Sequence, residues 1–499
     1  MAGAQWRVLQ ALNQINKANL ELAIDEPSIY KIIYPSRLLE VTLPVEFKGK
    51  TYMCLGFRAW FDNGLLHKPG QIVKGGIRFL SVEPKRERNF FSIANEIKAR
   101  KLALDDVMAL GLEMLAKNSG TNFARHVLIG FGLAKKNHLL AELDLAGGAK
   151  GVIVAPRSLH EADHNEFTQK ALAVFGYKLG IAGMVGWDKD VPAGDIGTTG
   201  KVGNNSVLDS FVDGYARALK DLGIKMRRNL IVGVITGKTA NKKYLGNPAR
   251  ATSTGLGTVE ALKVWAESKK IKINDLRVVF DGAGNAALPA AKFLVNSGIS
   301  VVGMTDSRSA IYIKNGLSLH DLEEISRFKA ERKSLADWSN WTNKSYLGKS
   351  KELVKKAGSL EKAKVQVWQK SGINVLFVSS DAMIINAGNV AALPKDILIV
   401  DGANGPVTPI AEKKLASKNI DHLTGSFANS GGVIGSLIEW SANVGNFSVS
   451  KDKAEEYIRF CIRSNFRVMK NLVDKGVVES LADAFYYVAM ERYLRMWVK

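Results

Sequence analysis

The sequence predicts an α/β protein of two domains, the second of which is built on a doubly wound, mostly parallel sheet. The length of 499 residues exceeds the size at which one hydrophobic core keeps growing, so two domains are expected. After about residue 226, short apolar segments alternate with helical patterns. This alternation is typical of strands joined by helical crossovers, which place helices on both faces of a parallel sheet.

The composition is that of a folded globular protein. Hydrophobic residues make up 46% of the chain and the 46 glycines are scattered, which excludes disordered and fibrous classes. No apolar stretch reaches the ~18 residues that a membrane helix needs. The two cysteines, Cys54 and Cys461, form neither a disulfide framework nor a metal-ligand pattern. We therefore expect a cytoplasmic protein with no metal and no membrane partner.

The formal net charge is +21, and part of it is concentrated between residues 331 and 370. This segment contains ten lysines and arginines but only four acidic residues. A surface for polyanions such as nucleic acid would need such a charge. The helical spacing of this segment, without a nucleic-acid motif, favours a solvated helical face. Nucleic acid is thus a possible partner that the sequence does not favour.

The first half of the chain mixes helical and strand patterns. Residues 1–40 are predicted to be helical, and alternating segments at 38–47 and 51–61 predict two strands around Gly49. Helical patterns dominate from about 85 to 140, and 152–156 is predicted to be a buried strand. Residues 186–206 form a glycine- and proline-rich segment that we interpret as a long loop, and such loops often carry functional groups.

In the second half, four apolar segments predict the strands of the parallel sheet: 276–280, 299–304, 373–378 and 397–400. From about residue 431 the pattern is helical, ending in an amphipathic helix at 481–496. The predicted domains are residues 1–225 for substrate binding and oligomerisation, and 226–430 for the parallel sheet. Helices in 431–499 are expected to pack back on the first domain.

A dinucleotide-binding turn follows the first strand of the parallel sheet. Gly282, Gly284 and Ala287 have G-x-G-x-x-A spacing after an apolar strand and before a helix. The first glycine permits the tight turn, the second lets the backbone approach a pyrophosphate, and the alanine allows close packing of helix and strand. Asp306, at the end of the next strand, stands where an acid meets ribose hydroxyls. This context predicts a Rossmann-type domain.

Two lysines and one aspartate of the first half stand in unusual settings. Lys150 follows two glycines and an alanine, and Lys74 precedes two glycines, of which Gly75 is the nearer. Glycines let backbone and ligand approach each other while the amine projects into a confined space. Asp190 precedes a Val-Pro pair that stiffens its loop. Burial lowers a lysine's pKa, so such an amine and a nearby carboxylate can exchange protons.

With these motifs the chain resembles the glutamate/leucine/phenylalanine/valine dehydrogenase family, and within it the glutamate dehydrogenases. The resemblance covers roughly residues 30–447 and the last helix. Nine motifs carry it, in this order: PSRLLEVTLPV, KGGIRF, GGAKG, DKDVPAGDIGT, TGK with TGLG, GAGNAA, VDGANGPVTP, FANSGGVIGSLIEW and ADAFYYVAMER. It implies reversible oxidative deamination of L-glutamate to 2-oxoglutarate and ammonia, in a cleft between the domains of a homo-oligomer.

The resemblance also implies roles for the first domain's residues. Lys150 corresponds to the lysine that activates water, and Asp190 to the acid that moves protons between substrate nitrogen and solvent. Lys74 and Ser436 match the pair that holds the side-chain carboxylate of glutamate, next to Gly75. Keeping both residues favours a dicarboxylic amino acid.

For the coenzyme, the resemblance implies contacts from several segments. Thr254 matches the residue at the nicotinamide amide, and Asn404 and Asn429 lie in motifs that line the same cleft. Asn285 and Ala286 complete the glycine-rich turn. Asp306 favours NAD, whereas Arg308, two positions later, is able to reach a 2′-phosphate, so NAD and NADP both stay open.

Two departures from the family pattern leave alternatives open. The family's lysine for the α-carboxylate lies twelve positions before the catalytic lysine, where this chain has His138. Lys136 has the usual local context and would fit if two residues were inserted after it. The segment ATSTGLG also has two residues more than the family's usual form.

Two other functions compete with glutamate dehydrogenase activity. The first is a dehydrogenase of another amino acid. The second is a non-catalytic paralogue with a regulatory or polyanion-binding role, which the positive charge and the substitution at His138 suggest.

Overall fold

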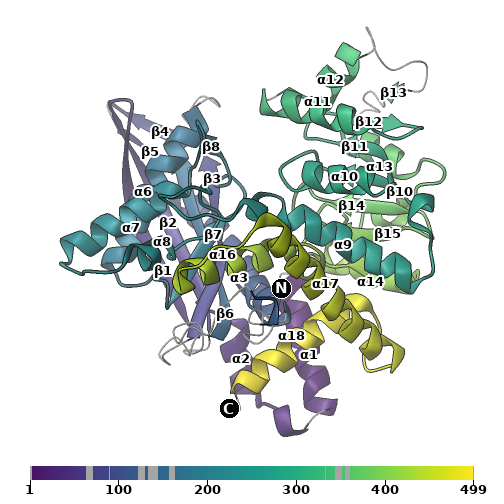
Figure 1. The fold of residues 1–499 in the computed structure, drawn as a ribbon, viewed down its shortest axis with the longest axis horizontal. Coiled ribbons are helices and arrows are strands. Elements are labelled where there is room, and N and C mark those ends of the chain that lie inside the picture. The colour runs from purple at the N-terminus through teal and green to yellow at the C-terminus, as the bar shows by residue number, and fades with distance from the viewer. Residues whose placement is uncertain are drawn as a thin grey trace. The chain divides into compact units, whose positions relative to one another are not determined.

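The computed structural model describes residues 3–18, 20–62, 71–88, 90–121, 130–132, 144–156, 163–331, 333–342, 351–353 and 360–497. The chain divides into two compact units, which are drawn in Figure 1. The first unit comprises Arg7–Ala251, Val433–Tyr457 and Ala489–Lys499. The second unit comprises Met1–Trp6, Thr252–Gly432 and Ile458–Val488.

The first unit combines a mixed sheet with helices. Its elements are α1 (Gly3–Ala18), η1 (Leu20–Leu22), α2 (Glu26–Ile33), β1 (Arg37–Phe47), β2 (Lys50–Phe61), β3 (Gln71–Val82), β4 (Pro84–Glu87), β5 (Phe90–Ile93), α3 (Glu96–Gly120), β6 (Asp144–Pro156), α6 (His164–Ile181), β7 (Asp190–Gly194), β8 (Lys201–Val202), β9 (Asn205–Ser206), α7 (Asp209–Asp221), α8 (Arg228–Val232), η4 (Pro248–Ala251) and α16 (Gly431–Gly445).

The sheet of the first unit has the strand order β4-β5-β2-β6-β3-β7, and β1 also pairs with β2. The β1–β2 hairpin closes at Lys48 and Gly49, both with positive φ, as a two-residue turn that matches the twist of the strands requires. Beyond it, β2 and β6 are antiparallel, whereas β6, β3 and β7 are parallel. The central strands β6 and β3 therefore have neighbours on both sides.

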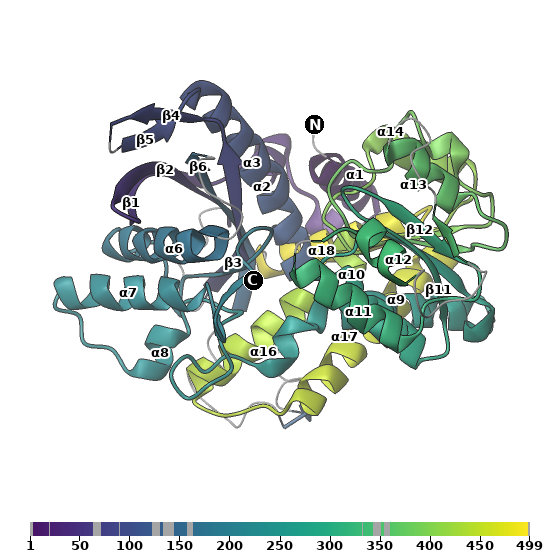
Figure 2. The same cartoon turned by 90° about the horizontal axis from the view of Figure 1, so that it is seen from above.

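Helices cover both faces of this sheet. Figure 2 shows α3 on one face and α6 with α7 on the other. Apolar side chains of α6 and α7, such as Phe175 and Phe211, share one buried core with the strand residues Leu43, Cys54 and Ile153. The sheet is thus a buried platform, and polar groups on its central strands are withdrawn from water.

The strands predicted at 38–47, 51–61 and 152–156 are confirmed as β1, β2 and part of β6. The helical prediction from about 85 to 140 is confirmed at α3, but residues 84–93 form the β4–β5 hairpin instead. The loop expected at 186–206 contains β7, because residues 190–194 pair with β3. Its short apolar stretch was too brief to predict a strand.

The second unit has a sheet with helices on both faces. Its elements are α9 (Ser253–Ser268), η5 (Ile273–Asp275), β10 (Arg277–Asp281), α10 (Ala287–Asn296), β11 (Ser300–Thr305), β12 (Ala310–Ile313), α11 (Leu319–Ala330), α12 (Leu335–Thr342), β13 (Lys351–Leu353), α13 (Leu360–Trp368), β14 (Val375–Val378), η6 (Val390–Ala392), β15 (Leu398–Asp401), α14 (Pro409–Ser417), β16 (His422–Leu423) and α15 (Gly425–Ala428). Helices α17 (Lys451–Asp474) and α18 (Leu481–Trp497) contribute to both units.

The strand order of the second unit is β13-β12-β11-β10-β14-β15-β16. Strands β11, β10, β14, β15 and β16 are parallel, and β12 and β13 continue the sheet in antiparallel sense. In Figure 2, α9, α10 and α11 lie on one face, and α13 and α14 on the other. The predicted doubly wound α/β class is confirmed, and the four predicted strands are β10, β11, β14 and β15.

The division into units differs from the predicted boundaries. Residues 226–251 belong to the first unit, because Val232, Ile235 and Tyr244 are part of its core with α6 and α7. Residues 458–488 belong to the second unit, where Arg463 donates hydrogen bonds of 2.8 and 2.9 Å to Glu267 of α9. Residues 433–457 and 489–499 do return to the first unit.

None of the helices in the described part of the chain combines the length and the apolar character that crossing a membrane requires.

Candidate active site

Lys150 lies within the sheet of the first unit. It belongs to β6, where it is paired in register with Ala59 of β2, and it is 1% exposed. Burial holds the pKa of its ammonium well below the ordinary value; Arg78 lowers this pKa further, whereas Asp106 and Glu113 raise it. This amine therefore loses its proton far more readily than a lysine in water.

The glycines next to the two lysines allow the main chain of neighbouring elements to approach closely. A Cβ atom on Gly148 would lie 2.1 Å from the amide nitrogen of Leu115 and 2.5 Å from the carbonyl oxygen of Gly111, both in α3. A Cβ atom on Gly75 would lie 1.5 Å from the carbonyl oxygen of Ala149 in β6. Because real atoms cannot approach so closely, α3 and β3 reach β6 only where side chains are missing.

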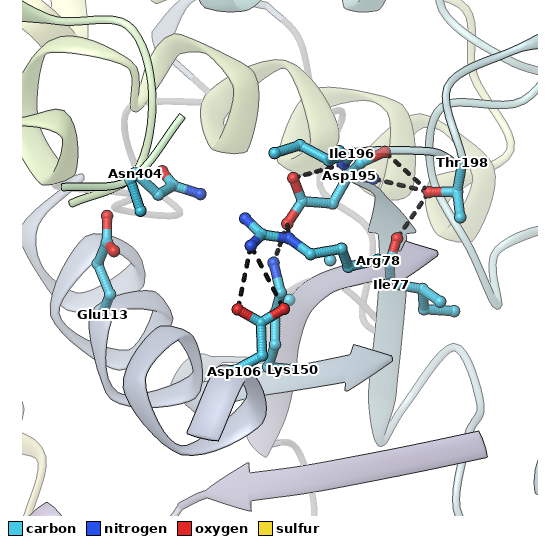
Figure 3. A network of polar contacts seen from close by, with 12 residues as sticks. Ile77, Arg78, Asp106, Glu113, Lys150, Asp195, Ile196, Thr198 and Asn404 are labelled. Carbon is cyan, nitrogen blue, oxygen red and sulfur yellow. Dashed lines mark hydrogen bonds and ion pairs between the residues drawn. The ribbon is translucent and has the colours of Figure 1, made fainter. Parts of the chain in front are cut away.

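The carboxylate that pairs with Lys150 belongs to Asp195 (Figure 3). Asp195 follows directly after β7, at the carboxyl end of that strand. Arg78 forms a second ion pair with it, with 3.6 Å between Nε and Oδ2. Arg78 Nη1 also donates to the two oxygens of Asp106 at 3.0 and 3.3 Å. Two basic and two acidic side chains thus form one network.

The turn after β7 fixes the position of Asp195. The backbone N–H of Ile196 donates to Asp195 Oδ1 at 2.7 Å, and the N–H of Asp195 donates to Thr198 Oγ1 at 2.9 Å. The Thr198 hydroxyl donates to the carbonyl of Ile77 at 2.6 Å, which ties this turn to β3. A Cβ atom on Gly76 would lie 2.9 Å from the Cβ atom of Asp195, so this glycine leaves room for the acid.

Asp190, the acid expected to move protons, has its carboxylate engaged by residues of β2. Its Oδ1 accepts from Arg58 Nη2 at 2.5 Å, and its Oδ2 accepts from Arg58 Nε at 2.7 Å and from Trp60 Nε1 at 2.9 Å. Asp190 is fully buried, and its carboxylate neutralises a buried arginine of β2. The carboxylate that pairs with Lys150 is that of Asp195, and the role of Asp190 in proton transfer stays a prediction. The signal that identifies Asp195 is its position just after a parallel strand.

Lys74, in β3, is 2% exposed, and within the described part of the chain its Nζ has no hydrogen-bond partner. Burial lowers the pKa of its ammonium to about 7; Glu439 and Asp190 raise this pKa, while Lys238 and Arg250 lower it. A buried cation without a counter-ion is costly. The site therefore favours an anionic ligand group.

Ser436, in α16, accepts a 2.8 Å hydrogen bond from Arg250 Nε through its hydroxyl oxygen. Burial lowers the pKa of the Arg250 guanidinium. Lys238 forms a buried ion pair with Glu439, 2.5 Å between Nζ and Oε1. Arg250 is thus a basic residue of this site that the sequence interpretation missed, and its charge lowers the pKa of Lys74.

The two residues considered for the α-carboxylate, Lys136 and His138, lie outside the described residues. A further basic residue is Lys117 of α3, which is 3% exposed and forms an ion pair of 3.5 Å with Glu113 one turn earlier. Its charge lowers the pKa of Lys150, so the two amines are neighbours. The structure therefore adds a candidate that the sequence interpretation did not consider.

A sequence signal for Lys117 exists. Lys117 is followed by an asparagine, Asn118, as Lys136 is followed by Asn137. Asn118 Nδ2 donates to the carbonyl oxygens of Lys74 at 3.0 Å and Gly147 at 2.7 Å, which bridges β3 and β6. A lysine in a helix that is buried on all sides from residue 110 to 120 is rare in globular proteins.

The glycine-rich turn of the second unit fits a dinucleotide pyrophosphate. Gly282 has φ +115°, and a Cβ atom there would lie 2.8 Å from the amide nitrogen of Ser380. Gly284 and Asn285 are exposed, and no described atom lies within 4 Å of the place where a Gly284 Cβ would stand. Ala286 follows, and Ala287 begins α10. The open space next to the amide end of a helix suits phosphate oxygens.

Three other residues predicted at the coenzyme lie in the second unit. Thr254 is in the first turn of α9 and is partly exposed. Asn429 Nδ2 donates to Asn404 Oδ1 at 2.9 Å and to the carbonyl of Ala403 at 3.0 Å. The structure therefore brings Asn404 and Asn429 together. Asp306 follows β11 as expected, but its carboxylate is engaged within the unit, where it accepts from Lys329 Nζ.

Within the described residues, no group of three or more His, Cys, Asp and Glu side chains is arranged to hold a metal ion.

A doubly wound sheet with a G-x-G-x-x-A turn in one unit, and a buried lysine paired with a partly buried aspartate in the other, define a dinucleotide-dependent dehydrogenase. The model of the Glutamate/Leucine/Phenylalanine/Valine dehydrogenase family matches residues 246–497. The chain belongs to this family, which confirms the resemblance of its motifs, and it is an enzyme of the amino-acid dehydrogenase class.

Curated relatives match over most of the chain. A glutamate dehydrogenase of Aeropyrum pernix is 28% identical over 490 residues, 96% of this chain and 96% of the relative. The NADP-specific glutamate dehydrogenase A1 of Halobacterium salinarum is 25% identical, with coverages of 96% and 94%. The catabolic NAD-specific glutamate dehydrogenase of Bacillus subtilis is 25% identical, with coverages of 87% and 82%.

Solved structures show the same fold. The glutamate dehydrogenase of Plasmodium falciparum has a TM-score of 0.71 at 22% identity, covering 99% of this chain and 91% of that one. The hetero-hexameric glutamate dehydrogenase of Thermus thermophilus, in its leucine-bound form, has a TM-score of 0.71 at 20% identity, covering 98% and 95%.

Proposed function

We propose that this chain catalyses the reversible NAD- or NADP-dependent oxidative deamination of L-glutamate to 2-oxoglutarate and ammonia. The observation that carries the proposal is the ion pair between buried Lys150 and partly buried Asp195. Relatives along nearly the whole chain that are named glutamate dehydrogenases support it.

The basic residues of the first unit bind the substrate's carboxylates. Lys74, whose Nζ lacks a described partner, takes the side-chain carboxylate together with Ser436 and Arg250. Lys117, next to Lys150, takes the α-carboxylate. Charge-assisted hydrogen bonds of this kind are the stronger class, so a dicarboxylic substrate is held at both ends and its Cα is oriented.

Lys150 and Asp195 move protons. The substrate's ammonium group must lose a proton before the C–H bond at Cα breaks, and the Asp195 carboxylate accepts it. A water molecule then adds to the resulting imine carbon while the neutral amine of Lys150 accepts the water's proton. The lowered pKa of Lys150 favours this neutral amine. Protonated Asp195 then returns its proton to the substrate nitrogen, which leaves as ammonia while the carbinol hydroxyl gives its proton to solvent and becomes the keto oxygen. The Lys150 ammonium releases its proton to solvent, which restores the neutral amine.

The second unit binds the coenzyme. Its glycine-rich turn from Gly282 to Ala286 holds the pyrophosphate, and Thr254, Asn404 and Asn429 hold the nicotinamide end. When bound, the dinucleotide supplies the ring carbon that accepts a hydride from Cα.

The test is absorbance at the reduced-nicotinamide band with glutamate and each coenzyme. Native protein is expected to give a signal, and Lys150→Met and Asp195→Asn are expected to lose at least about a hundredfold of it. Asp163→Asn, which removes a carboxylate paired with Lys48 at the surface, is the control and keeps the rate. Loss of the signal in the control, or its survival in either site variant, contradicts the proposal.

A substrate panel tests the specificity. A preference for leucine or phenylalanine over glutamate would show a dehydrogenase of another amino acid and would overturn the role of Lys74. Absence of turnover, with DNA or RNA affinity that falls steeply with salt, would show a non-catalytic polyanion-binding protein.

We also propose that the chain is cytoplasmic and assembles into a homo-oligomer. Its two cysteines are buried free thiols, which suits a reducing compartment. The Thermus thermophilus neighbour is hetero-hexameric, which supports assembly. Light scattering coupled to size exclusion tests the oligomeric state, and a mass of one chain, 54.4 kDa, contradicts it.

A further inference from the structure

Asp306, the acid expected to bind the coenzyme ribose, is surrounded by donors of its own unit. Its Oδ1 accepts from the backbone N–H groups of Arg308 and Ser309, both at 2.8 Å, and from the Ser309 hydroxyl at 3.0 Å. Its Oδ2 accepts from Lys329 Nζ at 2.9 Å and from the backbone N–H of Leu335 at 2.8 Å. Five donors therefore converge on one carboxylate.

This carboxylate has no capacity left for a ribose. Two carboxylate oxygens offer about four lone-pair sites, and all are used by the five internal donors. Asp306 is also only 6% exposed. Burial alone raises the pKa of this carboxyl, but backbone hydrogen bonds from Arg308 and Leu335 and the Lys329 ammonium outweigh it and lower the pKa. Asp306 thus stays ionised and saturated at any physiological pH.

The donors show what Asp306 does instead. Lys329 stands in the last turn of α11, and Leu335 begins α12. The hydroxyl oxygen of Ser309, itself bonded to Asp306, accepts from the N–H of Ala336 at 3.0 Å. Asp306 therefore fastens the end of β11 to two helices, and it is a structural anchor.

Arg308 stands on the same turn in a different setting. Its side chain is exposed and, within the described part of the chain, makes no hydrogen bond or ion pair. The charge of Arg308 acts on the carboxyl of Asp337. Hydrogen bonds from Ser334 lower the pKa of this carboxyl, and the Arg308 charge lowers it more weakly. The turn after β11 thus offers an exposed guanidinium, whereas the carboxylate of Asp306 is already engaged.

We propose that Arg308 binds the 2′-phosphate of NADP(H), so that this enzyme prefers NADP over NAD. The proposal rests on the proposed function and names its coenzyme. NAD normally gains hydrogen bonds from its ribose hydroxyls to an acid at this position, and here that acid is unavailable to it because of Lys329 and the turn. A guanidinium matches phosphate geometry with two parallel hydrogen bonds.

The test is direct binding without substrate. Calorimetric titration with NADPH, NADH, 2′,5′-ADP and 5′-AMP measures affinity independently of turnover. We expect NADPH to bind at least about tenfold more tightly than NADH, and 2′,5′-ADP more tightly than 5′-AMP by a similar factor. In Arg308→Gln, NADPH and 2′,5′-ADP lose about tenfold or more, while NADH changes by less than about twofold.

Lys314→Gln is the matched control, because it removes an exposed cation of the same unit away from Asp306, and it leaves all four affinities unchanged. The proposal is overturned if NADH binds as tightly as NADPH, or if Arg308→Gln weakens both coenzymes equally. Turnover of glutamate with NAD alone would overturn this inference and leave the proposed function intact. Failure of both coenzymes to bind would overturn the proposed function as well.

Discussion

Replacing Lys74 by methionine removes a buried ammonium that has no counter-ion among the described residues, and we expect it to stabilise the ligand-free protein. Burial lowers the pKa of Lys74 from 10.5 to about 7, which corresponds to about 5 kcal/mol against the charged form in the folded state. Methionine fills a similar volume without a charge. Lys74→Met therefore raises the free energy of unfolding by up to about 5 kcal/mol at pH 6.

The increase in the free energy of unfolding caused by Lys74→Met becomes smaller as pH rises. Below pH 7 the ammonium is charged in both the folded and unfolded protein, so the full penalty acts on the native chain. Between pH 7 and 10.5 the folded amine is neutral while the unfolded amine is still charged, so the penalty shrinks to about 2 kcal/mol at pH 9. The difference between the native protein and Lys74→Met therefore narrows as pH rises through this window.

The assay is urea-induced unfolding followed by fluorescence and circular dichroism at pH 6, 7.5 and 9, with and without glutarate. Glutarate, a dicarboxylate without an amine, supplies the missing counter-ion, so it raises the unfolding midpoint of the native protein and not of Lys74→Met. Lys238→Met is the control of opposite sign. It leaves Glu439 buried without its partner and costs about 3–5 kcal/mol. A destabilised Lys74→Met, or a gain that does not change with pH, refutes this reasoning.

Three further substitutions separate structural from functional positions. Gly148→Ala places a Cβ atom against the main chain of α3, and we expect it to lower the free energy of unfolding by about 3 kcal/mol or more. The measurement is the thermal unfolding midpoint, and an unchanged midpoint contradicts the close packing. Gly284→Ala meets no atom within 4 Å, so it keeps the midpoint but weakens coenzyme binding about tenfold or more in a titration, and equal affinity argues against the pyrophosphate site. Asp190→Asn leaves Arg58 without a full counter-charge and destabilises by about 3–5 kcal/mol in urea unfolding, whereas a stable but inactive variant would return Asp190 to the chemistry.

Local patterns were sufficient for much of the fold. Alternation predicted β1 and β2, and apolar runs predicted β10, β11, β14 and β15. These predictions were possible because the side-chain period of a strand and its burial are visible in consecutive residues. The glycine-rich turn was also predicted, since the tight turn at Gly282 and the close backbone approach at Gly284 depend on one short segment. Strand β7 was missed because its five residues, Asp190–Gly194, carry too little pattern.

The sequence by itself determined the α/β class, the dinucleotide turn, the family motifs and the lysine at position 150. Only the tertiary structure decided which acid meets that lysine, because Asp190 and Asp195 are five residues apart on one strand and its exit, and their partners Arg58 and Arg78 come from other strands. It likewise decided that Asp306 is saturated, since Lys329 and Leu335 approach it from distant helices. A side chain's chemical role follows from the charges and donors that surround it, and the fold brings these together from segments far apart in the chain.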